Sequence, residues 1–321
     1  SLGARKRVPF SCELPRMNDI APINWLRISA LGVIWGAAFM STTIALEGVG
    51  PLTLVAVRLC LGAILLLSIN LARGKSVPKI RGAAHLWAFI TAMALLSNAI
   101  PFALLSWGQQ HVASGFAGVC MAVVPLFTLP LAHFLVAGER MTLRRIIGFT
   151  MGTIGVIVLI GPAALNSTGA DFELLARLAC IGAASCYAMG SICTRLSPQS
   201  DLVELAAAVL IVAAVIFTPY AIFFEGWPAL PQGRSLWALI YLGLLPTGIA
   251  QIILIQVIKD AGPVFMGLVS YMVPAWSVVF GITILAEPLP SSLLLAMALI
   301  LSGVGISQYG PQKRLFTGRT A

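Results

Sequence analysis

Ten long apolar runs divide this sequence, and they constrain its fold more than any other feature. The runs lie at about 28–46, 52–72, 86–107, 112–136, 143–161, 175–194, 202–224, 236–257, 264–285 and 290–309. A membrane-spanning helix needs about 20 predominantly apolar residues, which these runs match. They are continuous rather than alternating and about twice as long as a barrel strand, so strands are not expected. The sequence therefore predicts an all-α integral membrane protein with ten transmembrane helices.

The composition excludes an ordinary soluble protein. Hydrophobic residues make up 59% of the chain and charged residues only 10%, whereas roughly a quarter of a typical soluble domain is charged. Ten spans would use roughly 200 residues of the 321 in the chain. The remainder is too small for a separate soluble domain, which usually needs at least about 50 residues. The chain is expected to be one membrane domain.

The net charge of +9 is expected to set the orientation in the membrane, so no nucleic-acid partner is predicted. When the N-terminus is placed in the cytoplasm, most Lys and Arg residues fall in loops on that side. Only Arg177 and Arg234 fall outside, and Arg58 lies within a span. The positive-inside rule then places both termini on the cytoplasmic side of the cytoplasmic (inner) membrane. Residues 1–24 are predicted to be a disordered cytoplasmic tail, and residues 310–321 a second cytoplasmic tail.

The two halves of the chain resemble each other. The segment LWAFI at 86–90 is echoed by LWALI at 236–240, and Pro125 followed by Glu139 is echoed by Pro274 followed by Glu287. These matches define repeats at 25–162 and 170–309, each with five predicted helices. Because five is odd, the second copy must run through the membrane in the opposite sense to the first. Inverted repeats of this kind are typical of secondary transporters, in which one half rocks against the other around a midplane site.

The sequence resembles the EamA-like branch of the drug/metabolite transporter superfamily. The resemblance rests on short motifs in the first half, Trp35 with Gly36, Pro51 with Arg58, and Pro125 with Glu139 and Arg140. Their second-half counterparts are Pro274 and Glu287 with Pro288, followed by Gly303 with Val304. It implies two five-helix repeats, alternating access and transport of small metabolites such as amino acids, their derivatives, nucleotide-like compounds or vitamins. The second half departs from the first where its second helix opens, since it has Asp201 and Glu204 and no Arg. Any role of Arg58 is therefore not duplicated.

Arg58 is the one ionisable residue well inside an apolar run. Burying a guanidinium is costly, so such a residue usually faces a cavity or a partner. Two roles stay open from the sequence. Arg58 could pair with Glu47, one loop away, or it could contact an anionic group of a substrate.

Two carboxylates, Glu139 and Glu287, follow equivalent helices on opposite sides of the membrane. Each lies at a helix–turn junction, where it could accept backbone N–H bonds from the next helix or pair with a nearby Arg. Structural capping is favoured over gating. No Asp or Glu lies near the centre of any predicted span.

A substrate cavity is predicted from polar and aromatic residues near the midplane of the helices that the family places around its translocation path. These residues are Trp35, Asn98, Thr128, Tyr187, Ser191, Thr247, Gln251, Tyr271 and Trp276. Four prolines, which free helix carbonyls for other partners, are predicted hinges beside this cavity: Pro101, Pro125, Pro246 and Pro274. The alternative is that the polar side chains only bond across helices.

The predicted function is secondary transport of a small organic metabolite by alternating access. The expected partners are a small-molecule substrate and the lipid bilayer. No cofactor, metal site or enzymatic activity is predicted, and the oligomeric state stays open, a monomer included. The alternatives are a lipid flippase or a membrane protein that transports nothing.

Overall fold

The computed structural model describes residues 21–75, 84–135, 141–160, 172–198, 201–227, 229, 231–266 and 268–308. Within these residues the chain is helical and contains no strand. The elements are α1 (Pro22–Leu46), α2 (Pro51–Ala72), α3 (Ala84–Ala94), η2 (Leu95–Ala99), α4 (Ile100–Gly108), α5 (Ser114–Cys120), η3 (Met121–Val123), α6 (Val124–Leu135), α7 (Leu143–Ile160), α8 (Glu173–Leu196), α9 (Leu202–Glu225), α10 (Gly233–Leu244), η5 (Leu245–Ile249), α11 (Ala250–Met266), α12 (Val269–Leu285) and α13 (Ser291–Gln308).

These elements form ten membrane spans, as the apolar runs predict. Eight helical segments are long and apolar enough to cross a membrane, and two shorter apolar helices, at Val269–Leu285 and Ser291–Ser307, complete the set. Three spans are built from more than one element: α3, η2 and α4; α5, η3 and α6; and α10, η5 and α11. The prediction of an all-α protein with ten spans is confirmed.

The first helix begins earlier than its apolar run. Pro22 stands at the start of α1, where its missing N–H costs nothing. Residues 22–24, predicted as the end of the N-terminal tail, therefore form the first turn of this helix. Residues 1–20 and 309–321 of the predicted tails, and Glu139, lie outside the described residues.

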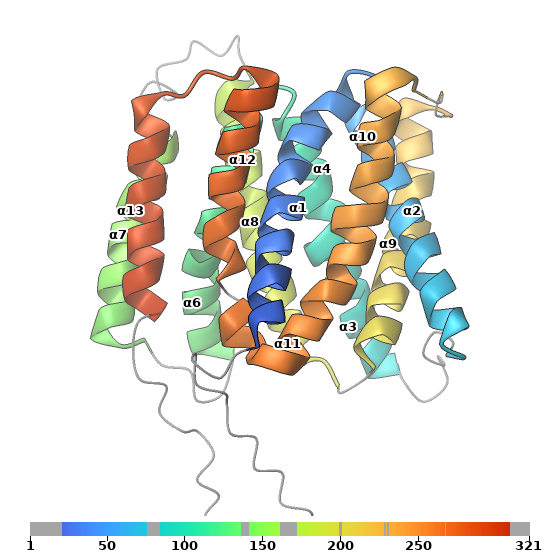
Figure 1. Cartoon of the computed structure of the whole chain (residues 1–321), viewed down its shortest axis with the longest axis horizontal. Helices are drawn as coiled ribbons and strands as arrows, with labels where there is room; N and C mark the ends of the chain where they lie inside the picture. The colour runs from blue at the N-terminus through green and yellow to red at the C-terminus, as the bar shows by residue number, and fades with distance from the viewer. Residues whose placement is uncertain are drawn as a thin grey trace, which may run out of the picture.

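The two repeats run in opposite directions and pack against each other. Three pairs of equivalent helices lie side by side: α2 with α9, α5 with α12, and α7 with α13. The α7–α13 pair forms one edge of the bundle, and α2 with α9 lies toward the opposite edge (Figure 1). Because each pair joins one helix from each repeat, the repeats share one body rather than forming separate domains.

Glycines allow the closest of these approaches. A Cβ on Gly36 of α1 would lie 2.4 Å from Cβ of Trp276 in α12. A Cβ on Gly148 of α7 would lie 2.3 Å from the carbonyl oxygen of Gly303 in α13. Any side chain at either position would push helices of opposite repeats apart, so these glycines set the distance between the halves.

Ion pairs connect the repeats at both ends of the bundle. At the face where α1 begins, Arg27 lies 2.6 Å from Asp260 of α11. At the opposite face, Glu47 lies 2.7 Å from Arg234 of α10. The same two spans are thus joined at both membrane faces through partly exposed side chains.

Candidate translocation site

Arg58 lies deep in the bundle between the two repeats. It is seven residues from the start of α2, about 10 Å along the axis, and only 8% of its surface is exposed. Its Nε donates a 2.7 Å hydrogen bond to Oγ1 of Thr247 in η5. Its guanidinium carbon lies 3.7 Å from the centre of the Phe102 ring of α4. Arg58 is therefore held by a hydroxyl at one edge and by an aromatic ring at one face.

The predicted ion pair between Arg58 and Glu47 is not formed. Glu47 follows the last residue of α1 and bonds to Arg234, at 2.7 Å. The expectation was wrong because the two residues, although close in sequence, lie at different depths. Glu47 sits at the end of the bundle, whereas Arg58 is two helical turns inside it.

Arg58 has no carboxylate partner in the part of the chain that the structure describes. The acidic residues there stand at or near the ends of the membrane spans: Glu47, Glu173, Asp201, Glu204, Glu225, Asp260 and Glu287. An arginine carries five N–H groups, and only the one on Nε has a partner among the described residues. The hydroxyls of Tyr187 and Tyr241 lie within electrostatic range of the guanidinium. The cation thus faces neutral, partly polar surroundings.

The π turn η5 builds the wall opposite Arg58. Pro246 has no N–H to offer to the carbonyl of Leu242, four residues before it. That carbonyl instead accepts a 2.7 Å hydrogen bond from Oγ1 of Thr247. The same hydroxyl accepts the hydrogen bond from Arg58 Nε. A proline, a wide helical turn and a bridging hydroxyl together position the arginine.

The same π turn is tied to α1. Nε1 of Trp35 donates to the carbonyl of Pro246 at 3.2 Å. In return, the Tyr241 hydroxyl donates to the carbonyl of Ile34 at 2.9 Å. Two of the predicted cavity residues therefore meet at η5: Thr247 belongs to it, and Trp35 of α1 bonds to the residue before Thr247.

An equivalent π turn, η2, interrupts the corresponding span of the first repeat. It occupies Leu95–Ala99, 150 residues before Leu245–Ile249. Nδ2 of the buried Asn98 donates to the carbonyl of Met93 at 3.4 Å, which spans five residues like the Thr247 bond. Pro101 follows in the first turn of α4. Because proline has no N–H, it cannot donate to the carbonyl of Ser97, four residues earlier and inside the π turn.

The other predicted cavity residues have more local surroundings. Thr128 and Ser191 donate to carbonyls of their own helices, at 3.0 Å and 2.7 Å. Trp276 stacks on Phe280, with ring centres 5.5 Å apart. Tyr187 packs against both large apolar clusters of the bundle, Tyr271 packs against one of them, and Gln251 is half-buried.

The remaining two predicted hinge prolines lie in other spans. Pro125 is the second residue of α6, which follows the 3₁₀ segment η3. Because proline has no N–H, it cannot donate to the carbonyl of Met121, the first residue of η3. Pro274 lies inside α12 and is buried. Three of the four prolines thus accompany a departure from the α-helix.

Comparison with known proteins agrees with this architecture. The profile of the EamA-like transporter family matches residues 25–161 and 174–308, one match on each five-helix repeat. The chain belongs to the EamA-like transporter family. Its membership supports a membrane transporter rather than an enzyme.

Several relatives of this EamA-like protein match over nearly their whole length. The "Uncharacterized transporter YoaV" of Bacillus subtilis (strain 168) is 25% identical, over 90% of this chain and 98% of its own. The "Uncharacterized inner membrane transporter YedA" of Escherichia coli (strain K12) is 28% identical, over 90% of this chain and 91% of its own. The "Probable terminal-alkyne amino-acid exporter" of Streptantibioticus cattleyicolor is 26% identical, over 85% of this chain and 89% of its own.

A solved crystal structure shares the fold of this EamA-like chain. It superposes with a TM-score of 0.64 at 22% identity, covering 89% of this chain and 98% of the other. At this level of identity the likeness concerns the fold alone.

Carboxylates cap two helices of the first repeat at the face opposite the start of α1. The Glu287 oxygens accept the backbone N–H groups of Ser114 and Gly115, at 2.7 Å and 3.0 Å, at the start of α5. Those of Glu225 accept N–H groups at the start of α2 in the same way. Glu287 therefore caps a helix of the other repeat, rather than the next helix along the chain.

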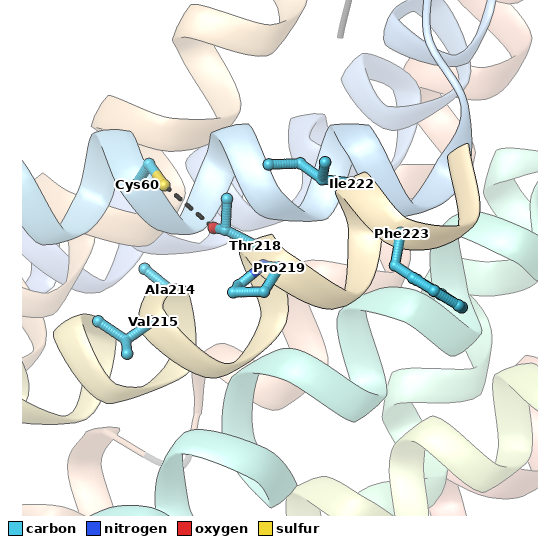
Figure 2. Close-up of a pocket in the computed structure, with 7 residues that line it drawn as sticks. All are labelled: Cys60, Ala214, Val215, Thr218, Pro219, Ile222 and Phe223. Atoms are coloured by element: carbon cyan, nitrogen blue, oxygen red, sulfur yellow. Dashed lines mark hydrogen bonds between the residues drawn. The ribbon is translucent and has the colours of Figure 1, made fainter. Parts of the chain in front are cut away.

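An apolar groove lies on the outside of the bundle between α2 and α9. Its volume is about 740 Å³, and its lining comprises Cys60, Ala214, Val215, Thr218, Pro219, Ile222 and Phe223 (Figure 2). The only polar contact drawn there joins Cys60 Sγ and Thr218 Oγ1 at 3.4 Å (Figure 2). None of the nine predicted cavity residues lines this groove. Its surface suits an acyl chain better than a polar solute.

Sequence reasoning missed three residues of the central cluster and its caps. Phe102 lies one helical turn after Asn98, on the same side of the span, so helical spacing could have pointed to it. Tyr241 precedes the π turn. The extra residue of that turn rotates Tyr241 relative to Thr247 by an amount that α-helical spacing does not predict. Nothing in the sequence around Glu225 indicates that it caps a helix 170 residues away.

Proposed function

We propose that the protein is a secondary carrier that moves a small organic metabolite across the cytoplasmic membrane by alternating access. Family membership supports transport, and the central cluster supports the place where a solute binds. The observation that carries the proposal is the polar cluster of Arg58, Thr247, Trp35 and Tyr241, because residues of both repeats meet there, well inside the bundle. A site shared by two inverted halves opens to each side in turn when the halves rock.

The end contacts support this motion. Arg27–Asp260 and Glu47–Arg234 join the first span to the same partner span at opposite faces. Exposed ion pairs contribute only about 0–1 kcal/mol, so either pair can break without unfolding the bundle. Opening one face while the other stays joined is the minimal cycle of such a carrier.

The proposed orientation places both termini in the cytoplasm. Charges of the described residues are unequal at the two faces, as the positive-inside rule requires. Arg27, Arg73, Lys75, Arg144, Arg145 and Arg195 stand at the face where α1 begins. Glu47, Glu173, Glu225 and Glu287 stand at the other, together with Arg177 and Arg234. Reporter fusions that place the two termini on opposite sides of the membrane would contradict this orientation.

The lipid-flippase alternative has weaker support. A flippase needs a path that shelters a polar head group as it crosses the bilayer. The outer groove between α2 and α9 is lined almost wholly by apolar side chains. We therefore favour the central cluster over the outer groove as the place of transport.

Reconstitution tests the proposal. Purified protein in liposomes is expected to exchange at least one member of a panel of labelled amino acids, nucleosides and vitamins, whereas empty liposomes do not. Two variants in a background without the six native cysteines then test alternating access. One carries Glu47→Cys with Arg234→Cys, and the other carries Arg27→Cys with Asp260→Cys.

Cross-linking either cysteine pair is expected to stop exchange, and reduction is expected to restore it. The single-cysteine variants are the matched controls and should be unaffected by the cross-linker. Undiminished exchange in both cross-linked variants would refute alternating access, and exchange of no panel member would refute the carrier itself.

A further inference from the structure

Arg58 is a buried cation without a counter-anion among the described residues. The other arginines and lysines with assigned ion pairs meet a carboxylate toward the end of a membrane span: Arg27, Arg73, Lys75, Arg177 and Arg234. Arg58 alone stands mid-span, 8% exposed, with a threonine hydroxyl and an aromatic ring as its contacts. Burial of an unpaired charge in a membrane protein is expensive, and such residues commonly mark a binding site.

We propose that Arg58 binds a carboxylate group of the transported solute. The assignment rests on the proposed function and adds the chemical class of the substrate to it. Because Nε of Arg58 already donates to Thr247, the edge of the guanidinium that stays free is the one formed by its two terminal nitrogens. That edge matches the two oxygens of a carboxylate in a bidentate pair.

The terminal nitrogens of Arg58 have no hydrogen-bond acceptor among the described residues. Buried side-chain atoms that lack a partner and are sealed from solvent occur on Asn70, Trp87 and Ser114 of the described residues. The nitrogens of Arg58 are not among these sealed atoms. They therefore lack a protein acceptor and retain some accessible surface, which leaves them available to a ligand.

The charge of the site selects a monoanion. No second Lys or Arg of the described residues stands inside a span beside Arg58, since the others lie toward or beyond the ends of the spans. A phosphate monoester carries close to two negative charges at neutral pH and would leave one of them unmatched in the bundle. A carboxylate matches the single guanidinium, which is held over the Phe102 ring. Nucleotide-like compounds are therefore disfavoured.

The site also predicts which group of an amino acid is dispensable. No Asp or Glu of the described residues lies mid-span to receive an α-ammonium group. The amine should therefore contribute little to binding, and an acid that lacks it should bind comparably. A carboxylate without an amine is thus a sharper probe than an amino acid.

Matched triads of compounds test the assignment by direct binding. One triad is L-phenylalanine, 3-phenylpropionate and phenethylamine, and a second is L-leucine, 4-methylvalerate and 3-methylbutylamine. The full-length protein in detergent is titrated with each while its melting temperature and heat of binding are recorded. The variants are Arg58→Gln and Arg58→Lys, with Arg144→Gln as the control that removes an exposed arginine outside the site and the end contacts.

In at least one triad, both carboxylates should bind wild type and Arg144→Gln, whereas the amine does not. Arg58→Gln should lose at least tenfold in carboxylate affinity, and Arg58→Lys should fall between. Without ligand, Arg58→Gln should melt within about 3 °C of wild type, because no ion pair is lost. A much lower melting temperature would assign Arg58 a structural role and overturn the proposal.

The remaining outcomes separate this assignment from the proposed function. Amines that bind as well as acids, acids that bind Arg58→Gln within threefold of wild type, or triads in which no acid binds would each overturn the assignment. Uptake of an amine or neutral solute by liposomes would then still support the carrier. Conversely, Arg58-dependent carboxylate binding without exchange of any solute would support the assignment and refute the carrier.

Discussion

The two π turns occupy equivalent places in the inverted repeats but are completed by different chemistry. In η2 the wide turn is closed by the amide of Asn98, and the turn packs on α9. In η5 it is closed by the hydroxyl of Thr247, which also binds Arg58 of α2. The position of α9 that lies 150 residues after Arg58 is Ala208, which is buried.

This difference separates the scaffold from the site. The backbone interruption is shared by both halves and therefore belongs to the duplicated fold. The cation and its hydroxyl partner occur once, so the chemistry that recognises a solute is not duplicated. In the carrier proposed above, the backbone interruption is shared by both repeats, whereas the group proposed to bind the solute, Arg58, has no counterpart in the second repeat.

Placing a second arginine at the equivalent position should have the largest effect. Ala208→Arg would bury a guanidinium opposite η2, where no threonine hydroxyl is bonded in the manner of Thr247. We expect destabilisation by about 3 kcal/mol or more, seen as loss of monodisperse protein and a fall in melting temperature. Ala208→Met controls for side-chain size. If Ala208→Arg melts like Ala208→Met, the two π turns offer an arginine equal environments and the comparison fails.

Removing the bridging hydroxyl should have the next largest effect. Thr247→Val keeps the shape but leaves Arg58 Nε and the Leu242 carbonyl unpaired, at about 1–3 kcal/mol for such a group. We expect a 10- to 100-fold loss in carboxylate affinity by calorimetry. Ser97→Ala, at the equivalent position of η2, should change affinity less than threefold. Equal losses in both variants would mean that the turns are functionally equivalent.

Restoring a backbone N–H in η5 should have a smaller effect of opposite sign on stability. Pro246→Ala allows position 246 to bond the Leu242 carbonyl and removes a proline from a helix interior. We expect the ligand-free protein to gain about 1–3 kcal/mol, measured by thermal unfolding, and to exchange solute more slowly. A loss of stability instead would show that packing, rather than the proline, holds the π turn.

The smallest expected effect concerns the helix starts, where the repeats differ again. Asp201 caps its own helix, α9, through the N–H groups of Val203 and Glu204, whereas the start of α2 is capped by Glu225. A hydrogen bond from Lys75, with further bonds from Glu204 N–H and Arg73, holds the pKa of Asp201 well below its usual range. Because this pKa is lowered, the carboxylate stabilises the fold above about pH 4, and the stabilisation is lost as the pH falls toward the lowered value.

The matching variant is Asp201→Asn, which keeps a capping oxygen but removes the charge. It should cost about 0.5–1 kcal/mol at pH 7, and the difference from wild type should shrink below pH 4. Thermal unfolding at pH 7 and pH 3.5 measures both values. A difference that does not change with pH would mean that the charge of Asp201 contributes nothing.

The fold could be predicted from the sequence because the membrane imposes length and continuity on every span. The ten runs and the echo of 86–90 in 236–240 are sufficient for two inverted five-helix repeats. The π turns could not be predicted in the same way. A proline signals a broken bond near Leu242, but only the three-dimensional packing decides that Thr247 repairs it.

The candidate site was only partly predictable. Arg58 stands out in sequence because a charge interrupts an apolar run, and Trp35 and Thr247 stand out as polar or aromatic residues at mid-depth. The partner of Arg58 could not be predicted, since Thr247 is 189 residues away and proximity in sequence pointed to Glu47. The capping partner of Glu287 was hidden for the same reason, because it lies in the other repeat.

A structure of the protein with the tightest-binding carboxylate of the triads tests the central claim most directly. The account predicts ligand density between α2 and η5, with carboxylate oxygens within about 3 Å of the Arg58 terminal nitrogens. Density beside Ala208 and η2, or in the outer groove between α2 and α9, would contradict it.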